Sequence, residues 1–265
     1  MKQAWLNTWA IIQKELKHFF VSPIAYVVMV IFLTLSGYFF YTGMVRFSEQ
    51  FKYAKQMIRF YQNPEMLTRF NLNEMVVAPA LFNMIFVFLF LLPLIMMRTF
   101  AEEKRQRTDE LLMTSPLTVN QILFGKFFGS LLFILILIAP TMVYQALLFI
   151  FAKPEMGPIL TGYLGVVLFA AGGVAIGLFA SSLTENQIIA AVITFVILLF
   201  MFIINFAGQS EGTFIYGIVK YLSVADHIRN LLRGLLDTRD LVYFGSIITL
   251  FLFLTKRSIE SVQWR

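Results

Sequence analysis

The segment Met75–Met97, MVVAPALFNMIFVFLFLLPLIMM, runs for 23 residues without a charged side chain. A helix needs about 20 mainly apolar residues to cross the hydrocarbon core of a bilayer, because each residue adds about 1.5 Å to its length. Pro79 and Pro93 lie inside the run and should bend the helix, which membrane spans tolerate. The segment therefore predicts a membrane-spanning helix.

Five further charge-free runs lie on either side of this segment. Four of them have between 22 and 29 residues, at 24–45, 127–152, 156–184 and 186–210. The fifth, 241–255, has only 15, so its flanking arginine and lysine side chains would have to reach back to the lipid headgroups. We expect one all-α, polytopic membrane domain over residues 1–265, with six spans at about 24–45, 75–97, 127–152, 160–183, 187–208 and 241–255.

Composition supports a membrane protein and excludes several other classes. Of the residues, 59% are hydrophobic and 14% are charged, whereas a soluble domain has about 25% charged residues. The absence of cysteine excludes disulfides and thiolate chemistry, and the sequence lacks H-E-x-x-H and G-x-S-x-G motifs. The basic cluster Lys104–Arg107 is too short for a nucleic-acid-binding face. We expect no catalytic residue, no metal site and no nucleic-acid partner.

The N-terminal segment has the pattern of an amphipathic helix. Apolar residues recur there at helical spacing, at Trp5, Trp9, Ile12, Leu16 and Phe20. Lys14, Glu15 and Lys17 are expected on the opposite, polar face. This pattern predicts an elbow helix that lies in the membrane interface with aromatic anchors. Ser22-Pro23 follows and places proline at the first helical position of span one.

Two segments between spans have characters of their own. Residues 46–74 are polar with interspersed aromatic residues and predict a short external helical excursion. Between spans five and six, two amphipathic pieces flank a break at Ser223, with apolar positions at Phe214, Ile218, Leu222, Ile228, Leu231, Leu232 and Leu235. Each piece is too short to cross the bilayer, so we expect an external hairpin of half-helices. Asp226 and His227 are expected to face solvent or headgroups rather than to form a ligand site.

The charge-free runs contain no Asp, Glu, Lys, Arg or His. Ion- and proton-coupled transporters usually need ionisable groups at membrane depth, so this composition argues against a secondary transporter that works by itself. Span four carries Gly173, Gly177 and Ser181 at a spacing of four, and such a stripe lets another helix approach closely. Static packing explains the stripe as well as a moving helix–helix contact does.

The most charged stretch of the chain connects spans two and three. It reads M-R-T-F-A-E-E-K-R-Q-R-T-D-E-L-L-M-T-S-P-L-T-V-N-Q-I-L-F-G-K from Met97 to Lys126. We expect a charged helix ending at Ser115-Pro116, which offers ion pairs and an apolar edge to a partner. A solvated connector is the alternative. Thr118 and Gln121 then form a capping-box pattern at the start of span three.

This stretch resembles the ABC-2 class of permeases. That family shows A-E-E-K/R after span two, then G-T-x-E-x-L, a proline, and G-K entering span three. The matching residues are Ala101, Glu102, Glu103, Lys104, Thr108, Glu110, Leu111, Leu112, Pro116, Gly125 and Lys126. Arg107 stands where the family often has glycine, so the turn before Thr108 can differ. Ser181 to Gln187 also looks like the family's short link between spans four and five, where Thr184 and Gln187 form a second capping-box pattern.

The resemblance covers nearly the whole chain and is nearest in appearance to permeases of the gliding-motility and copper-site-maturation type. It implies a permease in the inner (cytoplasmic) membrane that pairs with a second permease chain, identical or not, and docks on a cytoplasmic ATPase subunit. ATP and magnesium would bind that partner, because this sequence lacks the phosphate loop G-x-x-x-x-G-K-[ST]. The implied ATPase-coupling interface comprises Glu102, Glu103, Lys104, Arg105, Thr108, Asp109, Glu110, Leu111, Leu112, Thr184, Glu185 and Asn186.

The resemblance also implies that both termini and the segment 98–121 are cytoplasmic. Charge does not decide this topology, because 11 of the 21 Lys and Arg residues would then lie on the cytoplasmic side and 10 outside. Two other functions stay open at this point: an ATP-independent secondary transporter or channel, and a membrane scaffold or assembly factor.

Overall fold

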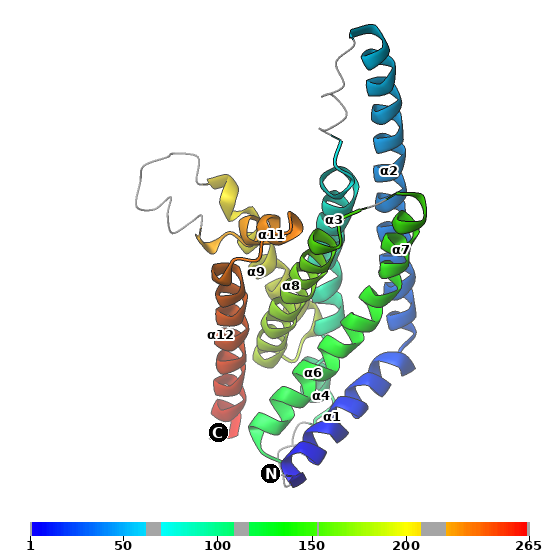
Figure 1. Cartoon of the computed structure of the whole chain (residues 1–265). Helices are drawn as coiled ribbons and strands as arrows, with labels where there is room; N and C mark the ends of the chain where they lie inside the picture. The colour runs from blue at the N-terminus through cyan, green and yellow to red at the C-terminus, as the bar shows by residue number, and fades with distance from the viewer. Residues whose placement is uncertain (1, 62–69, 109–116, 153, 208–220, 264–265) are drawn as a thin grey trace.

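The computed structural model describes residues 2–61, 70–108, 117–152, 154–207 and 221–263. These residues form helices and no strands. Six helical stretches among them are long and apolar enough to cross a membrane: Pro23–Met57, Asn73–Arg105, Val119–Ile150, Met156–Leu183, Gln187–Ile204 and Thr238–Ser261. The predicted all-α architecture with six spans is confirmed, and the bundle is shown in Figure 1.

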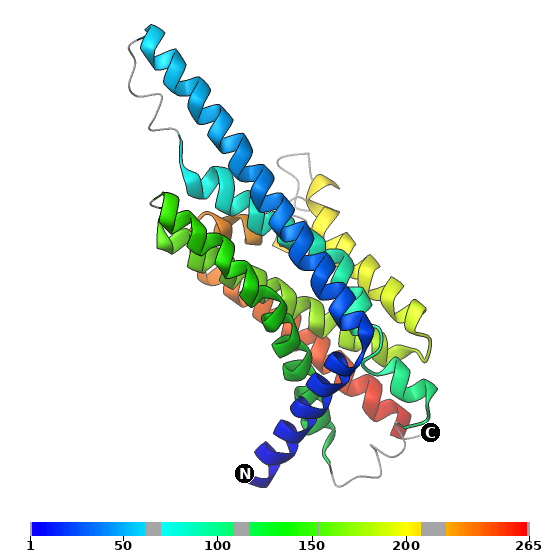
Figure 2. The ribbon, with the colours of Figure 1, turned by 90° about the vertical axis from the view of Figure 1, so that its right-hand side faces the viewer.

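Span one is much longer than its apolar run. Helix α1 (Lys2–Val21) crosses the end of the bundle, and α2 (Pro23–Tyr61) begins at the predicted proline and continues for 39 residues. At about 1.5 Å per residue this is about 58 Å, so α2 projects beyond the other helices (Figures 1 and 2). The predicted helical excursion over 46–74 is helical through Tyr61, but it continues α2 without a break, because residues 46–61 contain no glycine or proline.

Span two forms the centre of the bundle. A π-helical turn, Asn73–Val77, leads into α3 (Ala78–Met96), with Pro79 in the first turn and Pro93 inside the helix. Proline at 79 lacks the N–H of a regular helical bond, and the wider π-turn lies directly before it. The α3 side chains that point into the bundle are fully buried against α2, α8 and α9.

Span three starts earlier than predicted and is interrupted by a proline. Its first part, α6 (Val119–Ile138), begins with the expected capping box of Thr118 and Gln121. A 3₁₀ turn, Ala139–Thr141, contains Pro140 and leads into α7 (Met142–Phe151). Because the helix begins before residue 127, Lys126 lies inside a helix that is a candidate span. The charge-free run 127–152, which starts one residue later, still contains no Asp, Glu, Lys, Arg or His.

Span four, α8 (Met156–Leu183), is the most enclosed helix and packs against α3, α6, α9, α11 and α12. Its small-residue stripe faces α3. A Cβ atom added at Gly173 would meet Leu92 Cδ1 at 2.5 Å, and one added at Gly177 would collide with Met96. The stripe thus lets α3 and α8 approach closely, as predicted for helix packing.

Span five begins at the predicted residue 187, whereas span six is longer than predicted. Helix α9 (Gln187–Ala207) is capped by Asn186, whose Oδ1 accepts from the backbone N–H of Ile188 at 2.9 Å. The predicted capping box of Thr184 and Gln187 is wrong, since the Thr184 hydroxyl accepts instead from the N–H of Asn186. Helix α12 (Thr238–Gln263) has 26 residues rather than 15, because it includes the charged residues that flank the apolar run.

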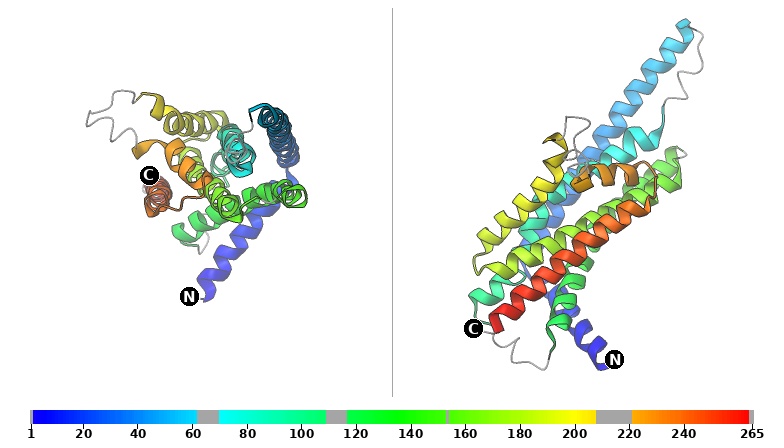
Figure 3. Two further views of the ribbon diagram at one scale, coloured as in Figure 1. Left: turned by 45° about the horizontal axis from the view of Figure 1, so that its top comes forward. Right: turned by 90° about the vertical axis from the view of Figure 1, so that its left-hand side faces the viewer.

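A short helix covers the end of the bundle opposite the termini (Figures 1 and 3). Helix α11 (Val224–Leu232) begins at the predicted break, where the Ser223 hydroxyl accepts from Asp226 N–H, and its apolar face packs on α8. The first predicted half-helix, with Phe214 and Ile218, lies outside the described residues.

His227 on α11 is buried and not solvated as predicted. Only 8% of its surface is exposed, and its Nδ1 lies 2.5 Å from Asp240 Oδ1 on α12. Its ring stacks on Tyr243 with 4.0 Å between the ring centroids. The prediction was wrong because it considered α11 alone, whereas α11 folds back onto the first turns of α12.

Candidate functional site

The first half of the predicted coupling segment is a short helix fastened to the end of α8. Helix α4 (Ala101–Arg105) has five residues. The Ser181 hydroxyl accepts hydrogen bonds from the N–H groups of Phe100 and Ala101, both at 2.9 Å. These N–H groups have no partner within the helix, so Ser181 satisfies them from another span. Lys104 Nζ donates to the Ser182 carbonyl oxygen at 2.5 Å, which ties the other side of α4 to α8.

Lys126 connects three segments that are distant in the sequence. Its Nζ lies 2.8 Å from Glu15 Oε1 on α1, 2.9 Å from Glu103 Oε1 on α4, and 2.8 Å from the Thr99 carbonyl oxygen. All three donors of the ammonium group thus have acceptors. The side chains of Lys126 and Glu15 are 1% and 5% exposed. We call this cluster of Glu15, Thr99, Glu103 and Lys126 the junction.

Two glycines in α6 allow α1 to reach the junction. A Cβ atom at Gly125 would lie 2.6 Å from Ile11 Cγ2, and one at Gly129 would lie 2.8 Å from Glu15 Cβ. The two glycines are four residues apart on α6, and they contact Ile11 and Glu15, which are four residues apart on α1. The Gly125-Lys126 pair therefore has a physical role: glycine admits the elbow helix, and lysine pairs with its carboxylate.

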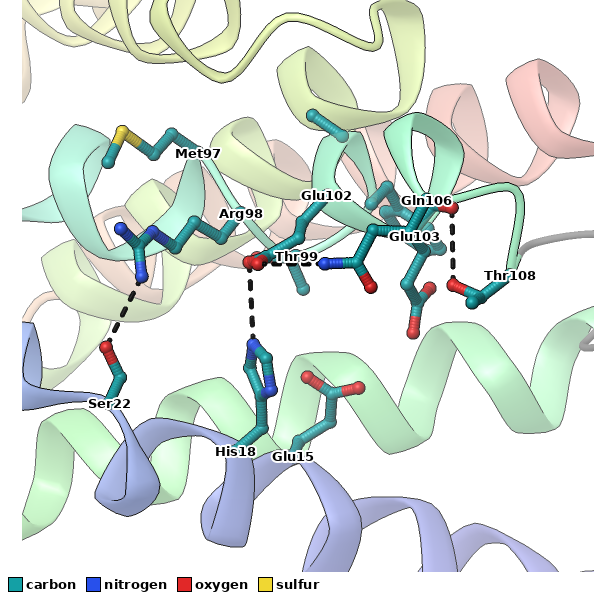
Figure 4. Close-up of polar contacts among 12 residues, drawn as sticks. Glu15, His18, Ser22, Met97, Arg98, Thr99, Glu102, Glu103, Gln106 and Thr108 are labelled. Carbon is teal, nitrogen blue, oxygen red and sulfur yellow. Dashed lines mark hydrogen bonds and ion pairs between the residues drawn. The ribbon is translucent and has the colours of Figure 1, made fainter.

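Weaker polar contacts surround the junction on its exposed side, as shown in Figure 4. Lys14 Nζ lies 3.3 Å from Glu103 Oε1, and His18 Nε2 lies 3.6 Å from Glu102 Oε2. Arg98 donates to the Ser22 hydroxyl at 3.3 Å. A polar cavity of about 240 Å³ lies among these side chains. The elbow helix, the end of span two and the start of span three thus meet at one polar cluster.

Other predicted interface residues face outward. Arg105, Glu185 and Asn186 are exposed, while Thr108 and Thr184 are half-buried. The Thr108 hydroxyl donates to the Glu103 carbonyl oxygen at 3.3 Å. Asp109, Glu110, Leu111 and Leu112 lie outside the described residues.

The predicted coupling helix does not run unbroken through this segment. Helix α4 ends at Arg105, and Arg107 has a φ of 54°, in the left-handed region that glycine adopts most readily. Although arginine replaces the glycine of the family pattern here, the backbone makes the turn that a glycine at this position would favour. The turn separates α4 from the residues that follow.

Sequence reasoning missed two members of the junction. Glu15 was placed on the polar face of α1, but it is 4% exposed and faces α6. Lys126 was noted in the Gly-Lys motif without a partner. Ile12 and Glu15 are three residues apart and therefore lie on one face of α1. This spacing was the signal that Glu15 could lie on the same side as the apolar residue Ile12. A separation of 111 residues between Glu15 and Lys126 could not be read from any periodicity.

Comparison with known proteins identifies the class. The family model described as ABC-2 family transporter protein matches residues 9–255. The chain therefore belongs to the ABC-2 transporter family and is a membrane permease subunit of an ABC transporter, and the family implies a partner ATPase. The match identifies the family and no subfamily. No curated protein matches the chain.

Proposed function

We propose that this permease is driven by a separate cytoplasmic ATPase that docks on the exposed side of α4 and on the link between α8 and α9. The docking surface consists of Arg105, Gln106, Arg107, Glu185 and Asn186, all of them exposed. It combines both signs of charge, which suits an orienting contact with a protein partner. ATP and magnesium bind the partner, and this chain performs no hydrolysis.

The observation that carries the proposal is the attachment of α4 on two sides. Ser181 and the Ser182 carbonyl hold it to α8, while Glu103 holds it to Lys126 on α6 and, through the junction, to α1. A displacement of α4 by an ATPase would therefore move the ends of three helices together. Packed interfaces shift between discrete arrangements rather than deform continuously, so a small displacement can rearrange the bundle.

The same reasoning gives the topology. Both termini and α4 lie at one end of the bundle, and six spans place both termini on one side of the membrane (Figure 1). We assign that side to the cytoplasm of the inner membrane, and place residues 47–73 and 212–239 outside. A second permease chain, identical or not, completes the transporter. Since the chain has no cysteine, a single cysteine at position 105 should react with impermeant reagents from the cytoplasmic side alone. Labelling from outside intact cells would refute the assignment.

The docking surface is tested by reversing its exposed cations. The double variant Arg105→Glu/Arg107→Glu should lose most co-purifying ATPase and transport-linked ATP turnover, because repulsion replaces attraction. Its thermal unfolding should stay close to that of the wild type, since exposed charges contribute little to stability. The matched control is Lys52→Glu/Lys55→Glu, the same reversal on exposed residues of the α2 extension. Equal ATPase recovery in both double variants would show that α4 is a plain connector.

Reversing Glu102 and Glu103 to lysine is a less selective test. From the sequence both residues are expected to face the ATPase, but in the structure Glu103 contacts Lys126 and Lys14, and Glu102 contacts His18. The double reversal would therefore disturb folding and docking together. Glu103→Gln separates them: we expect the ATPase to stay bound while its turnover no longer responds to substrate.

A further inference from the structure

Two cationic residues near the junction, Arg98 and Lys104, have no carboxylate within 4.0 Å among the described residues, whereas Lys14 and His18 each have one and Lys126 has two. Lys104 donates to the Ser182 carbonyl oxygen instead, so Arg98 is the one whose donors are not all used. Its Nε–H is buried and has no acceptor within the part of the chain that the structure describes. In Figure 4 the side chain points to Ser22, while Glu102, one turn further on, points to His18. An arginine with a buried free donor suits an anion that the protein itself does not supply.

The depth of Arg98 in the membrane follows from the sequence. It is the first charged residue after the charge-free run 75–97, and Ser22 lies two residues before the start of the run 24–45. The contact between their side chains places the ends of both runs at the same level. This level is the boundary between hydrocarbon and headgroups, where phospholipid phosphates lie.

The surroundings of Arg98 change from polar to apolar across this boundary. On one side is the polar cavity of about 240 Å³, which His18 and Arg98 also line. On the other side a shallow apolar groove, with a cavity volume of only about 30 Å³, lies between α2 and α3, and it is lined by Ile24, Ala25, Val28, Leu94, Ile95 and Phe133. Ile24 and Leu94 are 38% and 44% exposed, so the groove opens on the lipid-facing surface. His18, Phe19 and Arg98 line both sides.

From this arrangement we propose that the elbow between α1 and α2 is a binding site for one phospholipid. The phosphodiester accepts from Arg98, with the Ser22 hydroxyl and the exposed His18 ring beside it, and one acyl chain lies over the shallow groove, against the exposed side chains of Ile24 and Leu94. A phosphodiester presents the paired acceptor oxygens that an arginine fork matches. The bound lipid would add a further connection among α1, α2 and the end of α3, which the Arg98–Ser22 bond and apolar packing already join.

The first experiment uses the wild-type chain alone. The full-length protein, delipidated in mild detergent, is titrated with phosphatidylglycerol or with diacylglycerol of the same acyl chains, and bound lipids are counted by native mass spectrometry. We expect one phosphatidylglycerol per chain, bound about tenfold more tightly than diacylglycerol, because only the former carries a phosphate. Equal retention of both lipids would overturn the proposal.

A charge-matched pair of variants locates the site. Arg98→Gln should abolish the preference for phosphatidylglycerol, whereas Arg105→Gln, which removes an exposed charge from α4, should keep it. Arg98→Lys keeps the charge but loses the planar fork, and should retain an intermediate preference if Arg98→Gln does not fold. Unchanged selectivity in the folded position-98 variants would refute the assignment.

A last arm distinguishes a lipid from a soluble phosphate. Glycerophosphoglycerol, the same headgroup without acyl chains, should not displace phosphatidylglycerol at equal concentration, because it lacks the contact with the groove. Leu94→Trp, which adds bulk at the exposed wall of the groove, should weaken lipid binding several-fold. If the soluble headgroup competes as well as the lipid, and Leu94→Trp has no effect, the site binds free phosphate esters and the phospholipid proposal fails.

Discussion

The junction and the His227–Asp240 pair bury charge at opposite ends of the same bundle, but they join very different lengths of chain. Lys126 reaches Glu15, which is 111 residues away, and Glu103 on a third helix. His227 reaches Asp240, only 13 residues away, on the next described helix along the chain. The first cluster therefore fixes the relative positions of α1, α4 and α6, while the second fixes only how α11 lies on α12.

This difference indicates what each end of the permease is built for. A buried ion pair contributes little net stability compared with an apolar replacement, but it is costly to break and so fixes how its elements are oriented. At the end that carries α4, such pairs make several helices respond as one. At the opposite end, the His227–Asp240 pair links α11 to α12 alone, and among the described residues α11 contacts α8 through its apolar face and not through a buried ion pair.

Among the proposed variants, we expect Lys126→Met to reduce the stability of the protein most. The substitution leaves the Glu15 carboxylate buried without a counter-ion, which costs about 3–5 kcal/mol in comparable pairs. Glu103 is less affected because Lys14 remains 3.3 Å away. We expect a large loss of folded protein in the membrane and a strongly lowered thermal unfolding temperature.

Combining Glu15→Gln with Lys126→Met tests why stability is lost in the single variant. In the double variant Lys126→Met/Glu15→Gln the buried charge is gone, so much of the lost stability should return. If the double variant is as unstable as Lys126→Met alone, the cost comes from packing and not from an unpaired carboxylate.

His227→Ala should have a smaller and more local effect. Asp240 keeps a hydrogen bond from Asn230 at 3.4 Å and lies in the first turn of α12, where the helix dipole favours a negative charge. We expect a loss of about 1–3 kcal/mol in the stability of this end of the bundle. Hydrogen exchange should accelerate in 224–263 and stay unchanged in 2–21. Faster exchange in α1 would show that the two ends are coupled.

The sequence predicts the number of spans well because crossing the hydrocarbon requires long charge-free runs. It predicts helix ends poorly, since a run marks where lipid surrounds the chain and not where the helix stops. Helix α2 continues to Tyr61 through polar residues that are compatible with helix, and α6 begins at Val119, where its capping box lies.

The candidate site could likewise be predicted only in part. The segment Ala101–Lys104 could be located from its motif and its charge density. The partners of its residues could not, because they come from α1, α6 and α8 and depend on how these helices pack. Glu15 shows the limit most clearly: the amphipathic pattern of α1 groups it with Lys14 and Lys17, which are exposed, yet Glu15 itself is covered by α6. A helical pattern alone cannot reveal a buried carboxylate whose counter-ion lies in another helix.

The smallest effect should come from Lys14→Met, which makes it the sharpest control for Lys126→Met. Both lysines lie near the same Oε1 atom of Glu103, at 3.3 and 2.9 Å, but their side chains are 59% and 1% exposed. Water and salt screen the Lys14 pair, so its loss should cost at most about 1 kcal/mol and less at high ionic strength. Thermal unfolding at low and high salt measures both points. If Lys14→Met proved as destabilising as Lys126→Met, burial would not be what distinguishes the junction from its exposed side, and the contrast between the two ends of the bundle would lose its physical basis.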